Sequence, residues 1–295
     1  PDKFATGMTS HEYEQLVNNA DLPMFNRAIG GVYPPGSTFK IVTALAGLEG
    51  GELTASTIVE DNGSITIGPF TFPNWYFLQY GKTEGPVDIT RALQRSNDIF
   101  FYKAGEWIGI TNIAKWARIV GIGKPLGIEL SGEAGGLMPD PVWKNTRFDT
   151  PADKRARNNE WYLGDTYHVS IGQGYLLVTP LQVNTWTNII AHRGKACRPT
   201  IEKKGVRYSW SKESECVDLH IKKETLDLIT EGMREACATG GTGWPLFNFS
   251  VTKSSDQPVT APTISDSVAT PSGTAKRRIA VPIACKTGTA EFGDP

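Results

Sequence analysis

A serine and a lysine three residues apart, Ser37 and Lys40, are the strongest candidates for chemistry in the sequence. Residues with this spacing share one face of a helix, with Cβ atoms about 5–6 Å apart. A lysine placed there can accept the serine proton if burial or nearby positive charge lowers the lysine pKa. The pair therefore predicts a serine nucleophile for acyl transfer, activated by a lysine base.

The residues before Ser37 favour a helix that begins at this serine. Pro34 and Pro35 restrict the entering backbone, and Gly36 permits a sharp turn. Backbone N–H groups in a first helical turn have no partner within the helix, so they can stabilise the oxyanion of an attacked carbonyl. A plain helix N-cap serine beside a surface lysine is the alternative at this point.

Two other Ser-x-x-Lys segments begin at Ser209 and Ser250, but both lie in polar or strand-like stretches and are predicted to be solvated surface. The Ser37 segment differs because two further motifs follow it. Ser96-Asn97-Asp98 lies between two predicted helices, and Lys286-Thr287-Gly288-Thr289 ends a predicted strand. Together the three motifs place hydroxyl groups and two lysines at one site, which suits acyl transfer from a peptide with an anionic end.

In this order the motifs resemble those of penicillin-binding proteins and serine β-lactamases. Nearly the whole chain is similar to the transpeptidase domain of class B penicillin-binding proteins. The resemblance is carried by the elongation-type (penicillin-binding protein 2-like) segments 26–40 and 96–102, and by a class B pattern at 170–174 and 178–182. A division-type domain usually has an acidic residue before Pro-Gly, where this chain has Pro34.

The resemblance implies a role for each motif residue. Ser37 is the acyl-enzyme nucleophile, Lys40 its base, and Ser96 a proton relay to the leaving group. Asp98 replaces the commoner Asn and orients Lys40 or a substrate amide, although it can also be read as a helix N-cap. The backbone N–H groups of Ser37 and Thr289 form the oxyanion hole. The terminal carboxylate of a stem peptide or β-lactam is bound by Lys286, Thr287, Gly288 and Thr289.

The elements that must hold these residues are mixed in order, which favours an α+β or mixed α/β fold over a regular βαβ repeat. Helices are expected at 37–49, 86–93, around Phe100 to Trp107, and at 111–120, 180–193 and 224–237. A hairpin is expected at 65–72, a loop at 121–151, and a strand at 278–286. The resemblance implies a penicillin-recognising, β-lactamase-like fold with an antiparallel sheet flanked by helices and a helical subdomain.

Side chains outside the motifs support plainer predictions. Phe100, Phe101 and Trp107 are expected in the core. Cys285 falls opposite Lys286 in the predicted strand and is expected to be a buried structural thiol. Gln173 and Gly174 form either a structural turn or part of the wall of the site.

Composition excludes several classes of function. The 295 residues carry 30 Lys plus Arg and 31 Asp plus Glu, so the net charge of −1 gives no basic surface for nucleic acid. The four cysteines lack zinc spacing and do not settle the redox compartment. Some elongation-type relatives hold a metal through Asp, His and Cys before the second motif, but residues 41–95 contain neither His nor Cys. No metal and no cofactor are therefore expected.

The resemblance also predicts where the protein works and with what. It implies one partial transpeptidase domain over residues 1–295, truncated at both ends, with a Ser/Thr/Pro-rich flexible loop at 252–275. It implies a site on the extracytoplasmic face of the bacterial membrane, anchored by an upstream transmembrane segment. The expected partners are peptidoglycan stem peptides, β-lactams and a SEDS-type glycosyltransferase. Beyond the chain ends the family has further sheet strands, so exposed sheet edges and low stability are expected.

The predicted function is a serine D,D-transpeptidase that cross-links peptidoglycan for cell-wall growth and cell shape. A D,D-carboxypeptidase or a serine β-lactamase of the same fold is the first alternative, and each needs a group that activates water. A β-lactam sensor that acylates once is a second alternative. An inactive structural domain is a third, because Asp98 departs from the common motif.

Overall fold

The computed structural model describes residue 4 and residues 6–201, 216–253 and 277–290. Its helices are α2 Ser10–Val17, η1 (3-10) Gly36–Phe39, α3 Lys40–Gly50, α4 Trp75–Tyr80, α5 Ile89–Arg95, α6 Asp98–Ile119, α7 Pro141–Arg147, α8 Pro151–Ala156, α9 Leu163–Ser170, α10 Pro180–Ala191, α11 Lys223–Ala236 and η2 (3-10) Trp244–Leu246. Its strands are β1 Val59–Asp61, β2 Ser64–Ile67, β3 Phe70–Pro73, β4 Gly85–Val87, β5 Lys195–Cys197, β6 Cys216–Asp218, β7 Ser250–Lys253 and β8 Arg277–Ala280.

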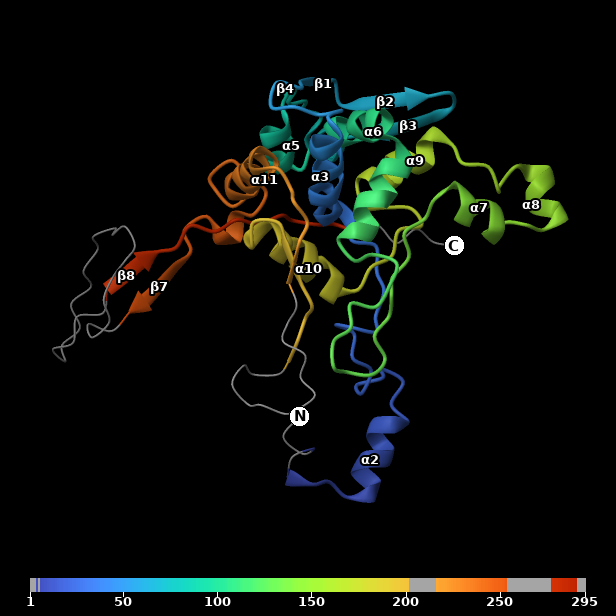
Figure 1. Cartoon of the computed structure of the whole chain (residues 1–295), viewed down its shortest axis with the longest axis vertical. Helices are drawn as coiled ribbons and strands as arrows, with labels where there is room; N and C mark the ends of the chain where they lie inside the picture. The colour runs from blue at the N-terminus through green and yellow to red at the C-terminus, as the bar shows by residue number, and fades with distance from the viewer. Residues whose placement is uncertain (1–3, 5, 202–215, 254–276, 291–295) are drawn as a thin grey trace.

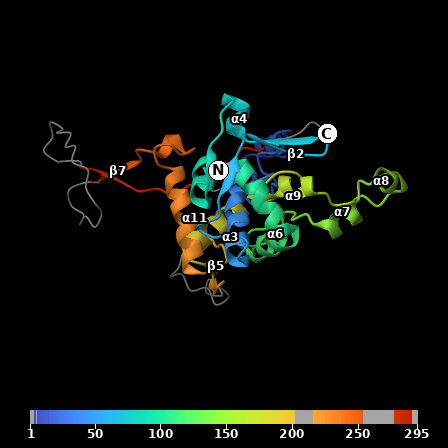
Figure 2. The same ribbon diagram turned by 90° about the horizontal axis from the view of Figure 1, so that it is seen from above.

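Helix α3 is the centre of the core. Every residue from Lys40 to Leu48 is buried, because the sequence places apolar or small residues on all sides of this helix. Figure 1 shows α3 between α11 on one side and α6 on the other, and Figure 2 agrees. Gly51 ends the helix in the left-handed conformation, as the Gly50-Gly51 pair predicts. Lys40, the first residue of this helix, is thus surrounded by protein and not by solvent.

Helix α6 follows the second motif and packs on α3 and α9. Its backbone breaks at Gly109, where φ is 73°, so the two helices predicted here meet at a kink. Phe100 and Phe101 are fully buried, as predicted. Trp107 is 44% exposed, so the prediction that it belongs to the core is wrong. It lies four residues after Lys103 and shares that outward face, whereas the buried stripe runs through Phe100 and Ala104.

The fold is mixed α+β, as predicted, but its described strands form four separate two-stranded antiparallel sheets. The predicted hairpin is present, with Ile67 opposite Phe70 across the turn. Pro86 and Val87 belong to β4, so the helix expected there begins only after the N-cap Asp88. Among the described residues, no helix is long and apolar enough to cross a membrane.

The segment 121–151 contains a helix that the loop prediction missed. Helix α7 begins after Asp140, whose side chain accepts a hydrogen bond from the Trp143 N–H, with Pro141 in the first turn. A second Pro-initiated helix, α8, follows the N-cap Thr150. Both helices project from the body in Figures 1 and 2. Each helix begins at an N-cap residue followed by proline, Asp140-Pro141 and Thr150-Pro151. The high Gly and Pro content of the segment had predicted a loop instead.

The strand predicted at 278–286 extends only to Ala280. Pro282 has no N–H to donate, and the N–H groups of Val281 and Cys285 donate to Phe249 and Met233 instead of to a neighbouring strand. Cys285 is not a free buried thiol: it forms a disulfide with Cys237, so that prediction is wrong. Of the loop predicted at 252–275, residues 252 and 253 belong to β7, and 254–275 lie outside the described residues.

Candidate active site

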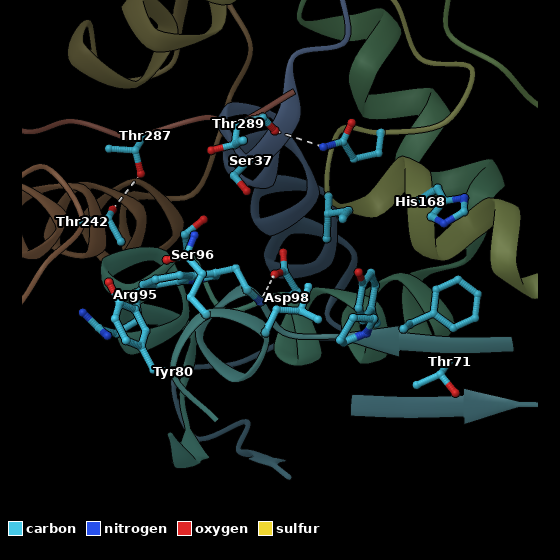
Figure 3. A pocket seen from close by; sticks show the side chains of 18 of the residues that line it. Ser37, Thr71, Tyr80, Arg95, Ser96, Asp98, His168, Thr242, Thr287 and Thr289 are labelled. Carbon is cyan, nitrogen blue, oxygen red and sulfur yellow. Dashed lines mark hydrogen bonds between the residues drawn. The ribbon is translucent and has the colours of Figure 1, made fainter. Parts of the chain in front are cut away.

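A cavity of about 1210 Å³ opens between the elements that carry the three motifs. Ser37, Ser96, Asp98, Thr287 and Thr289 all line it, and Figure 3 shows their side chains around one space. An aromatic wall comes from β3 and α4, with Phe70, Phe72, Trp75 and Tyr80 among its side chains. The cavity therefore brings together residues that are up to 252 positions apart in the sequence. The polar motif residues form one part of its lining, and the aromatic side chains form another.

Ser37 lies on the 3-10 turn η1, immediately before α3, and is half-buried. In a 3-10 turn the side chains of residues i and i+3 eclipse each other, which aligns Ser37 with Lys40. Figure 3 shows the Ser37 side chain pointing into the cavity on the side of Ser96. The predicted helix is thus present, but the serine stands on its tight first turn rather than inside the α-helix.

Lys40 is fully buried, and its amine has three partners. Its Nζ donates to Asp98 Oδ1 at 2.6 Å, to the Ser96 carbonyl at 2.7 Å and to Ser96 Oγ at 3.3 Å. The Phe101 ring lies beside the amine, 5.5 Å from ring centroid to Nζ. The amine is therefore fixed against the second motif, behind Ser96 and Asp98, which line the cavity.

Ser96 joins the two lysines. It ends α5 in the left-handed conformation, with φ of 53° and ψ of 39°, which is unusual for a serine and turns its carbonyl toward Lys40. Its hydroxyl accepts a hydrogen bond from Lys286 Nζ at 2.7 Å. The chain Lys40–Ser96–Lys286 is thus continuous through one hydroxyl group.

Burial lowers the pKa of Lys40, and the charge and hydrogen bond of Asp98 partly offset this effect. Lys286 as a residue is half-buried, but its amine is enclosed by Ser96 and the Thr287 carbonyl. Burial, and then the positive charge of Lys40, lower the pKa of Lys286 well below its ordinary value, while Asp98 acts in the opposite direction. With one carboxylate beside two amines, the free site favours one positive charge over two.

The third motif packs directly on the first. Gly36 has φ of 54°, and a Cβ there would lie 2.3 Å from the Thr289 carbonyl oxygen, so only glycine permits this approach. The Thr289 carbonyl also accepts a hydrogen bond from Gln173 Nε2 at 3.0 Å. Thr287 Oγ1 lies 2.7 Å from Thr242 Oγ1, within hydrogen-bond distance. These contacts hold the backbone of the third motif across the mouth of the cavity, beside Ser37.

Three of the predicted catalytic residues, Ser37, Ser96 and Asp98, line this cavity, as do Thr287 and Thr289 of the third motif. The two lysines do not line it: Lys40 is hydrogen-bonded to Ser96 and Asp98, and Lys286 is hydrogen-bonded to Ser96. Asp98 is not the N-cap of α6: Asn97 takes that position, and its side chain accepts a hydrogen bond from the Phe100 N–H at 2.8 Å. Gln173 and Gly174 line the cavity, in agreement with the site-wall alternative. Thr242 had no motif to reveal it, because a threonine in a Gly-rich turn is common on protein surfaces.

Comparison with known proteins agrees with this geometry. Residues 5–295 match the family described as "Penicillin binding protein transpeptidase domain". The peptidoglycan D,D-transpeptidase MrdA of Acinetobacter baumannii is 37% identical over 204 residues, which are 68% of this chain and 28% of that protein. The chain therefore spans less than a third of the length of this curated relative.

Solved structures are similar over most of the chain. Penicillin-binding protein PBP2 of Pseudomonas aeruginosa, in complex with WCK 5153, has a TM-score of 0.69 at 30% identity, covering 84% of this chain and 53% of that one. PBP2 of Helicobacter pylori, solved in complex with MreC, has a TM-score of 0.68 at 30% identity, covering 81% of this chain and 42% of that one.

Proposed function

The chain belongs to the penicillin-binding protein transpeptidase domain family, and from this premise we propose that it carries the active site of an elongation-type peptidoglycan D,D-transpeptidase. One observation carries the proposal. The Ser96 hydroxyl accepts hydrogen bonds from both Lys40 and Lys286, and Asp98 accepts one from Lys40. Ser37 lines the same cavity as Ser96. That arrangement supplies a nucleophile, a base and a proton path without a histidine.

Substrate binding would prepare the base. The carboxylate of a stem peptide beside Lys286 stabilises the charged form of that lysine. Lys40 can then give a proton to Ser96 Oγ while Ser96 gives its own to Lys286, since the hydroxyl contacts both amines. This transfer leaves Lys40 neutral at the moment when the substrate arrives. Thr287 and Thr289 would hold the same carboxylate with their hydroxyl groups.

Acylation then begins at Ser37. Lys40 takes the proton from Ser37 Oγ as the oxygen attacks the carbonyl carbon between the two terminal residues of the stem peptide. The N–H groups of Ser37 and Thr289 stabilise the oxyanion. When the C–N bond breaks, the leaving amine receives the proton from Lys40 through Ser96. The amine of a second stem peptide then attacks the resulting ester and gives a proton to the neutral Lys40. As the ester C–O bond breaks, Ser37 Oγ takes that proton from Lys40, which closes the cross-link and restores the free serine.

The carboxylic acid in the cavity lining is not free to activate water. Of the described residues that line the cavity, only Asp98 is a carboxylic acid, and both of its oxygens are engaged, by Lys40 and by the Trp75 N–H at 3.0 Å. A carboxypeptidase or β-lactamase needs a group that activates water for deacylation. The class B pattern at 170–174, whose Gln173 and Gly174 line the cavity, is the reason that the proposal ranks transpeptidation above the hydrolytic alternatives and above a sensor role.

The setting of the whole protein is part of the same proposal. Cross-linking of stem peptides takes place on the extracytoplasmic face of the bacterial membrane, so the longer protein would be anchored there. The antiparallel sheet of the family would surround the third motif. A SEDS-type glycosyltransferase is the proposed membrane partner, and the PBP2 of H. pylori solved with MreC supports assembly with further elongation proteins.

A fluorescent penicillin tests the proposal. The wild-type protein should form a stable adduct at Ser37, found by gel fluorescence and located by peptide mass spectrometry. Ser37→Ala should lose the adduct completely. Ser250→Ala, in another Ser-x-x-Lys segment, should keep full labelling. Equal labelling of wild type and Ser37→Ala would overturn the mechanism, and rapid release of opened drug would favour the β-lactamase alternative.

A further inference from the structure

A second polar cluster lies buried behind the candidate active site, between the β1–β2 turn, the start of α4 and the second motif. Its members are Asp61, Asn74 and Asn97, whose side chains are 1%, 0% and 1% exposed. None of the three lines the cavity. Three fully buried polar side chains so close to an active site need a structural reason, because burying such groups is costly unless they are hydrogen-bonded.

The Asp61 carboxylate is the centre of this cluster. Its Oδ2 accepts from Asn74 Nδ2 at 2.7 Å, from Asn97 Nδ2 at 2.7 Å and from the Glu84 N–H at 3.2 Å. Its Oδ1 accepts from the Gly63 N–H at 2.8 Å. Within the described part of the chain, no basic side chain forms an ion pair with it. Amide donors from four segments therefore satisfy this carboxylate.

The two asparagines connect Asp61 to the catalytic residues. Asn74 Oδ1 accepts from the Asp98 N–H at 3.2 Å, and Asn97 Oδ1 accepts from the Phe100 N–H at 2.8 Å. The side chain of Asn74 does not cap α4, although it stands at the N-cap position. The next residue, Trp75, donates its N–H to Asp98 Oδ2. Asp98 is thus held at its backbone and at its carboxylate by the segment that Asp61 fixes.

We propose that Asp61 is a positioning residue for the acyl-transfer site: through Asn74 and Asn97 it fixes the backbone of Asp98, and through Asp98 the amine of Lys40. The inference rests on the proposed function and adds a residue that none of the three motifs contains. A carboxylate suits the role because it accepts hydrogen bonds at both oxygens, whereas an asparagine would turn an NH2 group toward other donors.

Asp61→Asn tests the proposal, with the rate of fluorescent-penicillin acylation measured against pH. Misplacement of Asp98 and Lys40 should lower the maximal rate constant about tenfold or more. The rising limb of the profile, which reports the loss of one proton from the Lys40–Lys286 pair, should move to lower pH, since a less well-placed Asp98 stabilises positive charge on the pair less. The charged groups that face Lys40 are Asp98 and Lys286, and neither is removed in this variant.

Two further variants keep the test decisive. Asn74→Ala removes the link to Asp98 while Asp61 keeps its other three donors, so it should give the same acid shift even if Asp61→Asn does not fold. Asp140→Asn is the control: this carboxylate accepts a hydrogen bond from the Trp143 N–H and pairs with Arg118, but it is the N-cap of α7 and does not line the cavity. It should lose stability and keep the wild-type profile.

The outcomes separate this inference from the proposed function. Absence of any wild-type adduct at Ser37 would overturn the proposed function itself. A labelled wild type, together with an unchanged rate and pH profile in the folded Asp61→Asn or Asn74→Ala variant, would overturn the positioning role alone. A lower melting temperature with an unmoved profile would mean that Asp61 only stabilises the fold, and this too would contradict the proposal.

Discussion

At the scale of single residues, the site depends on one carboxylate that serves two lysines. Asp98 contacts Lys40 at 2.6 Å, and Ser96 separates Lys40 from Lys286. The sequence motifs were sufficient to predict that these four residues are neighbours, because the acyl-transfer chemistry expected of them needs their side chains in contact. They could not predict Asp61 or Asn74, because an acidic residue and an amide in a turn-rich segment are ordinary surface residues until the fold buries them.

Replacing Asp98 by Asn should show how this carboxylate tunes the base. Asp98 raises the pKa of Lys40, so its loss should lower that pKa. In the proposed mechanism Lys40 acts as a base when neutral, and the acylation rate rises with pH as the Lys40–Lys286 pair loses one of its two protons. The rising limb should therefore move to lower pH in Asp98→Asn. The measurement is the rate of acylation by a fluorescent penicillin between about pH 5 and pH 9, a range centred on the neutral pH at which catalytic bases work best.

A matched control for this prediction exists elsewhere in the protein. Lys144 and Asp165 form another largely buried pair, with 2.6 Å between Nζ and Oδ2. Asp165→Asn should cost a comparable amount of stability, about 3–5 kcal/mol for breaking a buried pair. It should leave the pH profile of acylation unchanged. An alkaline shift in Asp98→Asn, or an equal shift in both variants, would show that Asp98 does not tune Lys40.

At the scale of elements, the turn before α3 determines where the nucleophile stands. The helix prediction was right within a few residues, because Pro and Gly mark its start and an apolar run follows. What the sequence could not reveal is the crossing of three distant segments there: the Gly36 N–H donates to the Gly172 carbonyl, while Thr289 lies against Gly36. Such close backbone approaches depend on tertiary packing and leave only isolated glycines as a sequence signal.

Gly36→Ala should disrupt that crossing. Its Cβ would meet the Thr289 carbonyl oxygen at 2.3 Å, which must displace Ser37 or the third motif. A displacement of about 1 Å can cost on the order of 100-fold in rate. Gly68→Ala is the control, because φ is 55° there and 54° at Gly36. A Cβ added at Gly68 would have no neighbouring atom within 4 Å. Both variants carry a backbone penalty of about 1–2 kcal/mol.

The two alanine variants are compared by penicillin acylation and by thermal unfolding. We expect similar backbone costs in both, with an additional loss of acylation in Gly36→Ala alone. Acylation of Gly36→Ala at the wild-type rate would mean that Thr289 can move away without consequence for the nucleophile, and would remove the argument for a tight crossing.

At the scale of the whole molecule, local patterns predicted the helices well and the pairing of distant segments poorly. Amphipathic spacing predicted α11 and a capping box predicted α10, since both signals are contained in one helix. The strand before Lys286 was predicted too long, because alternation says nothing about whether a neighbouring strand is present. The spacing of four cysteines likewise leaves their pairing open, and both disulfides were missed.

Those disulfides give a test of how the third motif is held. Cys237–Cys285 ties the residue before Lys286 to the end of α11, whereas Cys197–Cys216 joins β5 to β6, neither of which lines the cavity. Closing loops of 48 and 19 residues should stabilise the fold by about 4 and about 3 kcal/mol. Double alanine variants of each pair should lose similar stability in urea unfolding. Only the Cys237/Cys285 variant should also acylate more slowly, because the residue next to Lys286 is then no longer tied to α11. Equal acylation rates in the two folded variants would contradict this prediction. That result would mean that the contacts of Thr287 and Thr289 hold the third motif without the disulfide.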